Sequence, residues 1–88
     1  MPTISMFFGI VIRMYYAPKE HGPPHIHIYY NDKVGVMKIS NCEITKGDLP
    51  SKQKRLVAAW VEIHRDELLG NWKLCQQGKK PFKIDPLK

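Results

Sequence analysis

The hydrophobic pattern of this chain changes its period once, at residues 47–50 (GDLP), and that change limits the folds the chain can adopt. Before this point, short apolar segments rich in β-branched and aromatic residues are separated by turn-forming residues, which is typical of β-strands. After it, apolar residues recur every three or four positions, as in an amphipathic helix. The sequence therefore predicts an α+β domain in which strands precede helical structure.

We expect residues 1–46 to form an antiparallel meander of three to four strands. The segment 4–16 is interpreted as one strand, because it is apolar on both alternating faces after Gly9. It is either a central strand covered on both sides or a strand that lies against the helical layer. Residues 41–46 either extend the last strand or form a short fourth strand. The other predicted segments are a proline-rich loop over 17–24, a strand over 25–30, a turn over 31–33 and a strand over 34–39.

Residues 50–77 are expected to form one long or kinked helix, or two helices, packed on one face of the sheet. Ser51 suits the N-cap position, and Gly78 is a residue that commonly ends a helix. A kink at Gly70 and a second helix capped by Asp66 both fit the pattern. The apolar stripe, which we expect in the core, consists of Leu56, Val57, Trp60, Val61, Ile63, His64, Leu68, Leu69, Trp72 and Cys75.

The 88 residues are enough for one domain, with residues 78–88 as an extended basic tail. Phe82, Ile84 and Leu87 could dock this tail on the domain or on a partner. The longest apolar run, 6–12, is far shorter than the roughly 20 residues that cross a membrane, so we expect a cytoplasmic protein that does not associate with membranes. In a reducing compartment, Cys42 and Cys75 are expected to be free, partly buried thiols.

Basic residues are concentrated in the second half of the chain. The formal net charge is +6, and residues 49–88 contribute +5 of it, with nine Lys and Arg against four Asp and Glu. Such an excess attracts polyanions, of which nucleic acid is the commonest in the cytoplasm, and it also suits an acidic protein partner. The charge therefore leaves RNA and a small acidic protein as candidate partners.

Residues 21–30 (HGPPHIHIYY) hold three of the four histidines. His25 and His27 are two positions apart on a predicted strand, so their side chains leave the same face, together with Tyr29. The intervening isoleucines point the other way, as on a strand that buries one face. The two prolines before His25 make the approach to the strand stiff and extended. The pattern therefore predicts two imidazoles held in a defined position on an open face.

Three roles fit these imidazoles. As general base and general acid, they could take a proton from an RNA 2′-hydroxyl and return one to the leaving 5′-oxygen, with Arg13, Lys33 or Lys38 neutralising the phosphate. As metal ligands, they would need a third donor from His21, His64 or a carboxylate. As structural residues, they would hydrogen-bond a neighbouring loop.

Two further groups on the predicted helix are candidates for the site. Glu67 lies one helical step from His64, close enough to pair with its imidazole. Lys52, Lys54 and Arg55 form either a solvated first turn or a cluster that follows a phosphate backbone beside tyrosines. Cations are disfavoured at a helix N-terminus, and this makes a binding role for the cluster more attractive.

Three segments, MPTISMFFGIVIRMYY, PPHIH and LVAAWVEIHRDELLGNW, occur in an order that resembles small bacterial proteins grouped as domain of unknown function 4160. Such proteins are usually encoded beside a second small domain, as in toxin-antitoxin pairs, so the resemblance implies a partner protein. Ile26 replaces a frequent aromatic residue, and Met6 replaces a frequent basic one that could touch phosphate. The positions that match the family pattern are Pro23, Pro24, His25, His27, His64, Glu67, Asn71 and Trp72.

Together these observations lead to a first hypothesis, a cytoplasmic type II toxin that acts as a small ribonuclease without a metal or other cofactor. A cognate acidic protein encoded nearby would cover its active face, and the oligomeric state stays open. The alternative is a binding module, antitoxin or adaptor, that does not cleave; a third hypothesis is a metal site of His25, His27 and His21. The residues expected to act are His25, His27, His64 and Glu67 in catalysis and Arg13, Tyr15, Tyr29, Lys38, Lys52, Lys54 and Arg55 in nucleic-acid binding.

Overall fold

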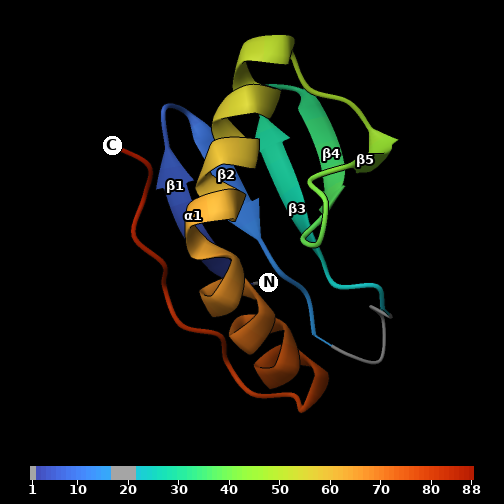
Figure 1. Ribbon diagram of the computed structural model, residues 1–88, viewed down its shortest axis with the longest axis vertical. Coiled ribbons are helices and arrows are strands. Elements are labelled where there is room, and N and C mark those ends of the chain that lie inside the picture. Colours follow the sequence, from blue (N-terminus) through green and yellow to red (C-terminus); the bar gives the residue numbers. More distant parts are fainter. Residues whose placement is uncertain (1, 17–21) are drawn as a thin grey trace.

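The computed structural model describes residues 2–16 and 22–88, which form a five-stranded antiparallel sheet covered on one face by one long helix (Figure 1). The predicted α+β class, with strands first and a helix packed on one sheet face, is confirmed. The helix, α1, runs from Ser51 to Gln76. The strands, which lie side by side in chain order, are β1 (Thr3–Phe7), β2 (Ile10–Arg13), β3 (His25–Tyr30), β4 (Lys33–Lys38) and β5 (Ile44–Gly47).

The sheet has more strands than expected because the segment 4–16 is not one strand. It folds back at Phe8 and Gly9, so that β1 and β2 pair as an antiparallel hairpin. Both turn residues have positive φ, 49° for Phe8 and 77° for Gly9, as the tight turns of two-residue hairpins require. The first turn position usually holds Asn, Asp or Gly, and here it holds an aromatic residue. Gly9 alone did not indicate a hairpin turn, and the single-strand prediction was wrong.

The remaining strands follow the predicted boundaries closely. The turn between β3 and β4 contains Asn31 at a φ of 52°, a conformation that asparagine tolerates better than most residues. Residues 44–47 form the separate short strand β5, one of the two alternatives for this region. A register shift between Val36 and Met37 in the pairing of β4 with β5 leaves Val36 opposite Lys46 and Met37 opposite Ile44.

The core lies between the sheet and α1 (Figure 1). Trp60 and Trp72 are buried, as predicted for the apolar stripe. Ile63 was expected in the same stripe, but the residue is 66% exposed. The stripe is therefore narrower than the sequence pattern indicated. The sheet residues buried against the helix include Ile4, Phe7, Ile10, Ile12, Met14, Ile26, Ile28, Met37 and Ile39.

The ends of α1 are set by Pro50 and Gly78. Pro50 takes the N-cap position with φ −57° and ψ 147° and gives no side-chain cap, so the prediction of Ser51 as N-cap was wrong: Ser51 is already helical. At the other end Gly78 has a φ of 74°, and the N–H groups of Gly78 and Lys79 donate to the carbonyls of Cys75 and Leu74. These two bonds form a Schellman motif, which confirms the predicted helix end.

One residue inside α1 departs from helical geometry, and it is His64, with φ −111° and ψ 22°. The sequence offered a kink at Gly70 or a new helix capped by Asp66. The structure instead places the irregular backbone at His64, six residues before Gly70. The helix is therefore kinked, which was one of the expected alternatives, but the kink is at His64.

The C-terminal tail docks on its own domain, beside β1 and α1 (Figure 1). The Ile84 N–H donates to the Ile4 carbonyl at 2.8 Å, and the Trp60 Nε1–H donates to the Asp85 carbonyl at 2.8 Å. Asn71 bonds the backbone of Phe82 twice, donating to its carbonyl at 2.8 Å and accepting from its N–H at 3.0 Å. These contacts cover part of the outer edge of β1, which would otherwise be an exposed sheet edge.

We predict that Gly47→Ala destabilises the fold more than Gly78→Ala. Both glycines have positive φ, which costs an alanine roughly 1 kcal/mol. A Cβ on Gly47 would also lie 2.0 Å from the Val34 carbonyl oxygen, whereas a Cβ on Gly78 would meet nothing within 4 Å. The extra overpacking should add about 1–3 kcal/mol to the loss in the free energy of unfolding, measured by urea denaturation. Equal losses in the two variants would contradict the close approach of β5 to β4.

We also predict that Asn71→Ala releases the tail. Loss of both hydrogen bonds to Phe82 should cost about 1–3 kcal/mol and speed amide hydrogen exchange at Phe82 and Ile84. The control is Lys73→Ala, an exposed position on the same helix, which should leave exchange in the tail unchanged. Unaltered exchange in Asn71→Ala would mean that the tail is held by its other contacts.

Candidate functional site

A cluster of aromatic and basic side chains occupies the open sheet face at β2 and β3 and reaches the C-terminal half of α1. Strand pairing places Arg13 directly opposite His27. Because side chains alternate along a strand, His27 and Tyr29 leave the face opposite to the buried Ile26 and Ile28. We call this group the histidine cluster; its members are Arg13, Tyr15, His25, His27, Tyr29 and Trp72.

The members of the histidine cluster are joined by a continuous series of contacts. The guanidinium carbon of Arg13 lies 4.9 Å from the centre of the Tyr29 ring, and the Tyr29 hydroxyl is hydrogen-bonded to the Tyr15 hydroxyl. The Tyr15 and His27 rings are 4.4 Å apart, centre to centre, and the His27 and His25 rings 5.4 Å. The His25 ring lies 4.9 Å from Trp72. Both imidazoles are therefore packed between aromatic rings.

The backbone before β3 fixes the orientation of His25. Its Nδ1 lies 2.9 Å from the Pro23 carbonyl oxygen, which can only accept a hydrogen bond. Nδ1 must therefore carry the proton, and in the neutral ring the lone pair is on Nε2. An Nε2 lone pair is what a general base or a metal ligand requires. The Pro23 carbonyl thus orients the imidazole of His25.

The surroundings of Tyr29 hold its phenol in the neutral form. Burial raises the pKa of Tyr29, and its hydrogen bond to Tyr15 raises that pKa further, while the nearby Arg13 cation acts in the opposite direction. The net direction is upward from the ordinary tyrosine value of about 10. Tyr29 therefore acts as a neutral hydrogen-bonding ring beside the histidines.

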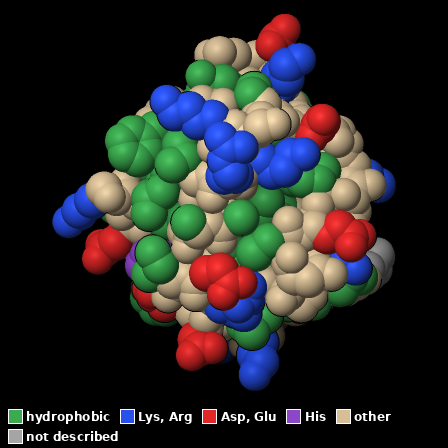
Figure 2. Space-filling view, turned by 45° about the horizontal axis from the view of Figure 1, so that its top comes forward, with side chains coloured by type: hydrophobic (Ala, Val, Ile, Leu, Met, Phe, Trp, Pro, Cys, Tyr) green, Lys and Arg blue, Asp and Glu red, His purple; other side chains and the backbone are tan. Residues whose placement is uncertain are grey.

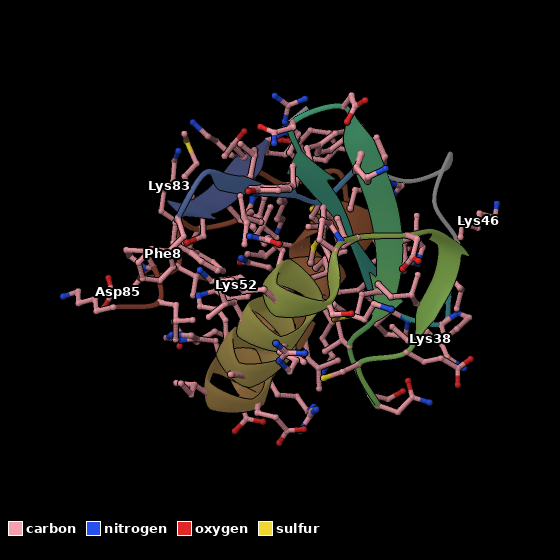
Figure 3. All side chains as sticks on the ribbon, turned by 90° about the horizontal axis from the view of Figure 1, so that it is seen from above. Phe8, Lys38, Lys46, Lys52, Lys83 and Asp85 are labelled. Carbon is pink, nitrogen blue, oxygen red and sulfur yellow. The ribbon has the colours of Figure 1, made fainter. Side chains whose placement is uncertain are left out.

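Two lysines extend the cluster across the sheet. Lys38 is the cross-strand partner of His25, so the two side chains leave the same face of the sheet. Lys46 is paired with Val36, and Val36 is paired with His27, so all three share one face. Figure 3 shows Lys38 and Lys46 beside β5, on the side of the molecule away from Phe8. Sequence reasoning missed Lys46 because the register of β5 cannot be read from the chain alone.

His64 and Glu67 form a separate pair within the helical layer. The His64 Nδ1 lies 2.6 Å from the Glu67 carboxylate, as the helical spacing predicted, and the His64 ring packs 5.6 Å from Trp60. Eight residues separate His64 from Trp72, which is about 12 Å of helix. His27 projects from the sheet face opposite to the helix. The structure therefore joins His64 to Glu67 and Trp60, whereas the helix residue that packs on His25 is Trp72.

The basic residues at the start of α1 also lie outside the histidine cluster. Lys52 lines a pocket with Phe8 and Tyr30, and Tyr30 is at the end of β3 opposite to His25, about 17 Å away along this six-residue strand. The pKa of the Asp48 carboxyl is held below its usual value, first by the hydrogen bond that it accepts from the Leu49 N–H and then by an ion pair with Lys54 at 3.1 Å. Figure 2, which brings the start of α1 forward, shows Lys and Arg side chains gathered there. Lys52, Lys54 and Arg55 thus form a second basic surface. Lys33, opposite Tyr30, also lies at this end of the sheet.

Part of the geometry that a metal site would need is present in the structure. His25 and His27 are adjacent, as an HxH metal site would require. Within residues 2–16 and 22–88, no three His, Cys, Asp or Glu side chains converge as a metal site. His21, the proposed third ligand, lies outside the described residues. The metal hypothesis therefore stays a prediction.

Comparison with known protein families identifies the family of this chain. Residues 9–73 match the family model described as Domain of unknown function (DUF4160). The chain belongs to this family. The searches of curated proteins and of solved structures each found no match. The part that matches the DUF4160 model contains all six members of the histidine cluster, whereas β1 and the docked tail lie outside it.

Three further residues that match the DUF4160 pattern make structural contacts. The backbone of Pro23 orients His25, Trp72 packs against His25, and Asn71 holds the tail.

Cys42 is half-buried and Cys75 is buried, and burial raises the pKa of both thiols. In the described part of the chain, no helix is long and apolar enough to cross a membrane.

We predict that Tyr15→Phe lowers the pKa of Tyr29, because it removes a hydrogen bond that favours the neutral phenol, and that Arg13→Gln raises it. An NMR titration of ring-labelled tyrosine measures both shifts. Because the folded pKa is raised, Tyr29 stabilises the fold below pH 10, and this stabilisation is lost as the pH rises through the raised value. Tyr29→Phe should remove that alkaline loss. The control, Tyr16→Phe, lies outside the cluster and should leave the pKa of Tyr29 unchanged.

Proposed function

We propose that this protein is a small metal-independent ribonuclease, that it acts in the cytoplasm as the toxin of a type II toxin-antitoxin pair, and that the histidine cluster is its active site. The observation that carries the proposal is the pair of imidazoles, 5.4 Å apart, on the open sheet face. Two histidines at this spacing can act as base and acid on one phosphodiester near neutral pH.

In the proposed reaction His25 is the general base, because its neutral ring carries the lone pair on Nε2. It takes the proton of an RNA 2′-hydroxyl, and the 2′-oxygen attacks the adjacent phosphorus. The bond from phosphorus to the 5′-oxygen breaks as protonated His27 gives its proton to that oxygen. The products are a 2′,3′-cyclic phosphate and a 5′-hydroxyl end.

Arg13 and the tyrosines complete the proposed site. The Arg13 guanidinium is stacked on Tyr29 and lies opposite His27, where it can stabilise charge on the phosphate. Tyr15 and Tyr29 offer aromatic faces for a nucleobase. His64 has no role in this proposed reaction, because it pairs with Glu67 and packs on Trp60 rather than on the histidine cluster. The proposed antitoxin is a small acidic protein that covers the same face, in keeping with the net charge of +6.

A second candidate function, supported by the packing of Tyr15, is a non-catalytic binding module. Its ring lies 4.4 Å from His27, and its hydroxyl is bonded to Tyr29, so the rings form a fixed platform. Such a platform suits stacking of unpaired bases without chemistry. An antitoxin or adaptor would use it to bind RNA or a partner.

We predict that the purified protein cleaves single-stranded RNA in the presence of EDTA, and that His25→Ala and His27→Ala each lower the cleavage rate by at least about 100-fold. Cleavage is measured on a labelled oligoribonucleotide, with detection of the cyclic phosphate. Induced expression in a bacterial host should arrest growth, and the double variant at a matched soluble level should not.

The matched control is His64→Ala, which removes an imidazole outside the histidine cluster and should retain cleavage. RNA binding with steep salt dependence but no cleavage would favour the binding module. Cleavage that EDTA abolishes and a divalent metal restores would replace acid-base chemistry with a metal site.

A further inference from the structure

The register of the sheet places two members of the histidine cluster in a row of paired residues that crosses four strands and has a basic residue at each end. Arg13 on β2 is paired with His27 on β3, and His27 with Val36 on β4. Val36 is in turn paired with Lys46 on β5. Directly paired residues in antiparallel strands project from the same face, so this row lies on the open face. We call Arg13, His27, Val36 and Lys46 the basic row.

The spacing of the basic row follows from the sheet itself. Neighbouring strands are about 4.8 Å apart, so Arg13 and Lys46 are separated by roughly 14 Å of backbone, with His27 between them. Lys38 lies in the next row, opposite His25. A phosphate at the histidines would therefore have a cation on each side. This arrangement suits a chain of anions better than one isolated anion.

The two ends of the basic row differ in how firmly they are held. The Arg13 Nε donates to the Thr3 hydroxyl at 3.3 Å, and the guanidinium is stacked on Tyr29. These contacts hold the Arg13 cation against Tyr29. Lys46 is exposed, on the short edge strand β5. Arg13 can therefore hold a phosphate in a defined position, whereas Lys46 acts as a mobile charge.

We propose that the basic row binds single-stranded RNA whose backbone runs across the strands from β2 to β5, with successive phosphates near Arg13, His27 and Lys46. This inference rests on the proposed function and names its substrate class. Tyr15 and Tyr29 lie beside the row and can stack only bases that are not paired in a duplex. A rigid duplex cannot present its bases to a flat sheet in this way.

The test is binding of a six-nucleotide 2′-O-methyl RNA, which has no 2′-hydroxyl to attack and so cannot be cleaved. Fluorescence anisotropy measures its dissociation constant for the wild type, Lys46→Ala, Lys46→Arg and Lys52→Ala. We expect Lys46→Ala to weaken binding about tenfold and to reduce the salt slope by about 0.7. Lys46→Arg should retain affinity. Lys52→Ala, on the second basic surface, should change it less than about twofold.

The proposal is overturned by equal weakening in Lys46→Ala and Lys52→Ala, because binding would then follow net charge alone. It is also overturned by duplex RNA that binds as tightly as the single strand, or by Lys46-dependent binding of polyglutamate without binding of the oligonucleotide. Failure of the two proposals is separable. Lys46-dependent binding with no cleavage of ordinary RNA would contradict only the proposed ribonuclease activity. Cleavage with Lys46-independent binding would contradict only the proposed binding of RNA along the basic row.

Discussion

Burial of one face of β2 and β3 beneath α1 is the constraint on which the rest of the structure depends. Ile10, Ile12, Ile26 and Ile28 are fully buried there, and each such side chain contributes roughly 1.5–3 kcal/mol. The side-chain period of a strand is two, so a shift by one residue would move these isoleucines to the solvent side. The same packing that forms the core therefore forces His27 onto the open face.

The helix contributes both to the hydrophobic core and to the histidine cluster. Trp60 closes the core beneath the sheet and holds the tail through Asp85, whereas Trp72, farther along α1, packs against the His25 ring. His25 is thus fixed by its own strand, by the preceding proline segment and by the helix. Stability of the domain and orientation of the imidazole depend on the same helix. Changes at Trp72 would affect both, which is why variants of His64 and Lys46 separate function from folding more cleanly.

Sequence reasoning succeeded where the signal was local. The shift from strand to helix, the termination of the helix at Gly78 and the shared face of His25 and His27 all follow from spacing within a few residues. It failed at Phe8, where an aromatic residue occupies a turn position, and at Ile63, where an apolar residue on the stripe is exposed. In both cases the surrounding structure outweighs the preference of the single residue.

The sequence by itself determined the α+β class, the pairing of His64 with Glu67 and the stiff approach to β3, because these depend on backbone periodicity and neighbouring residues. Only the tertiary structure decided which distant groups meet. Lys46 joins Arg13 and His27 through the register of three strand pairs, and Trp72 reaches His25 from the other layer. Strand register and helix placement minimise the free energy of the whole core, and no short segment of the chain encodes them.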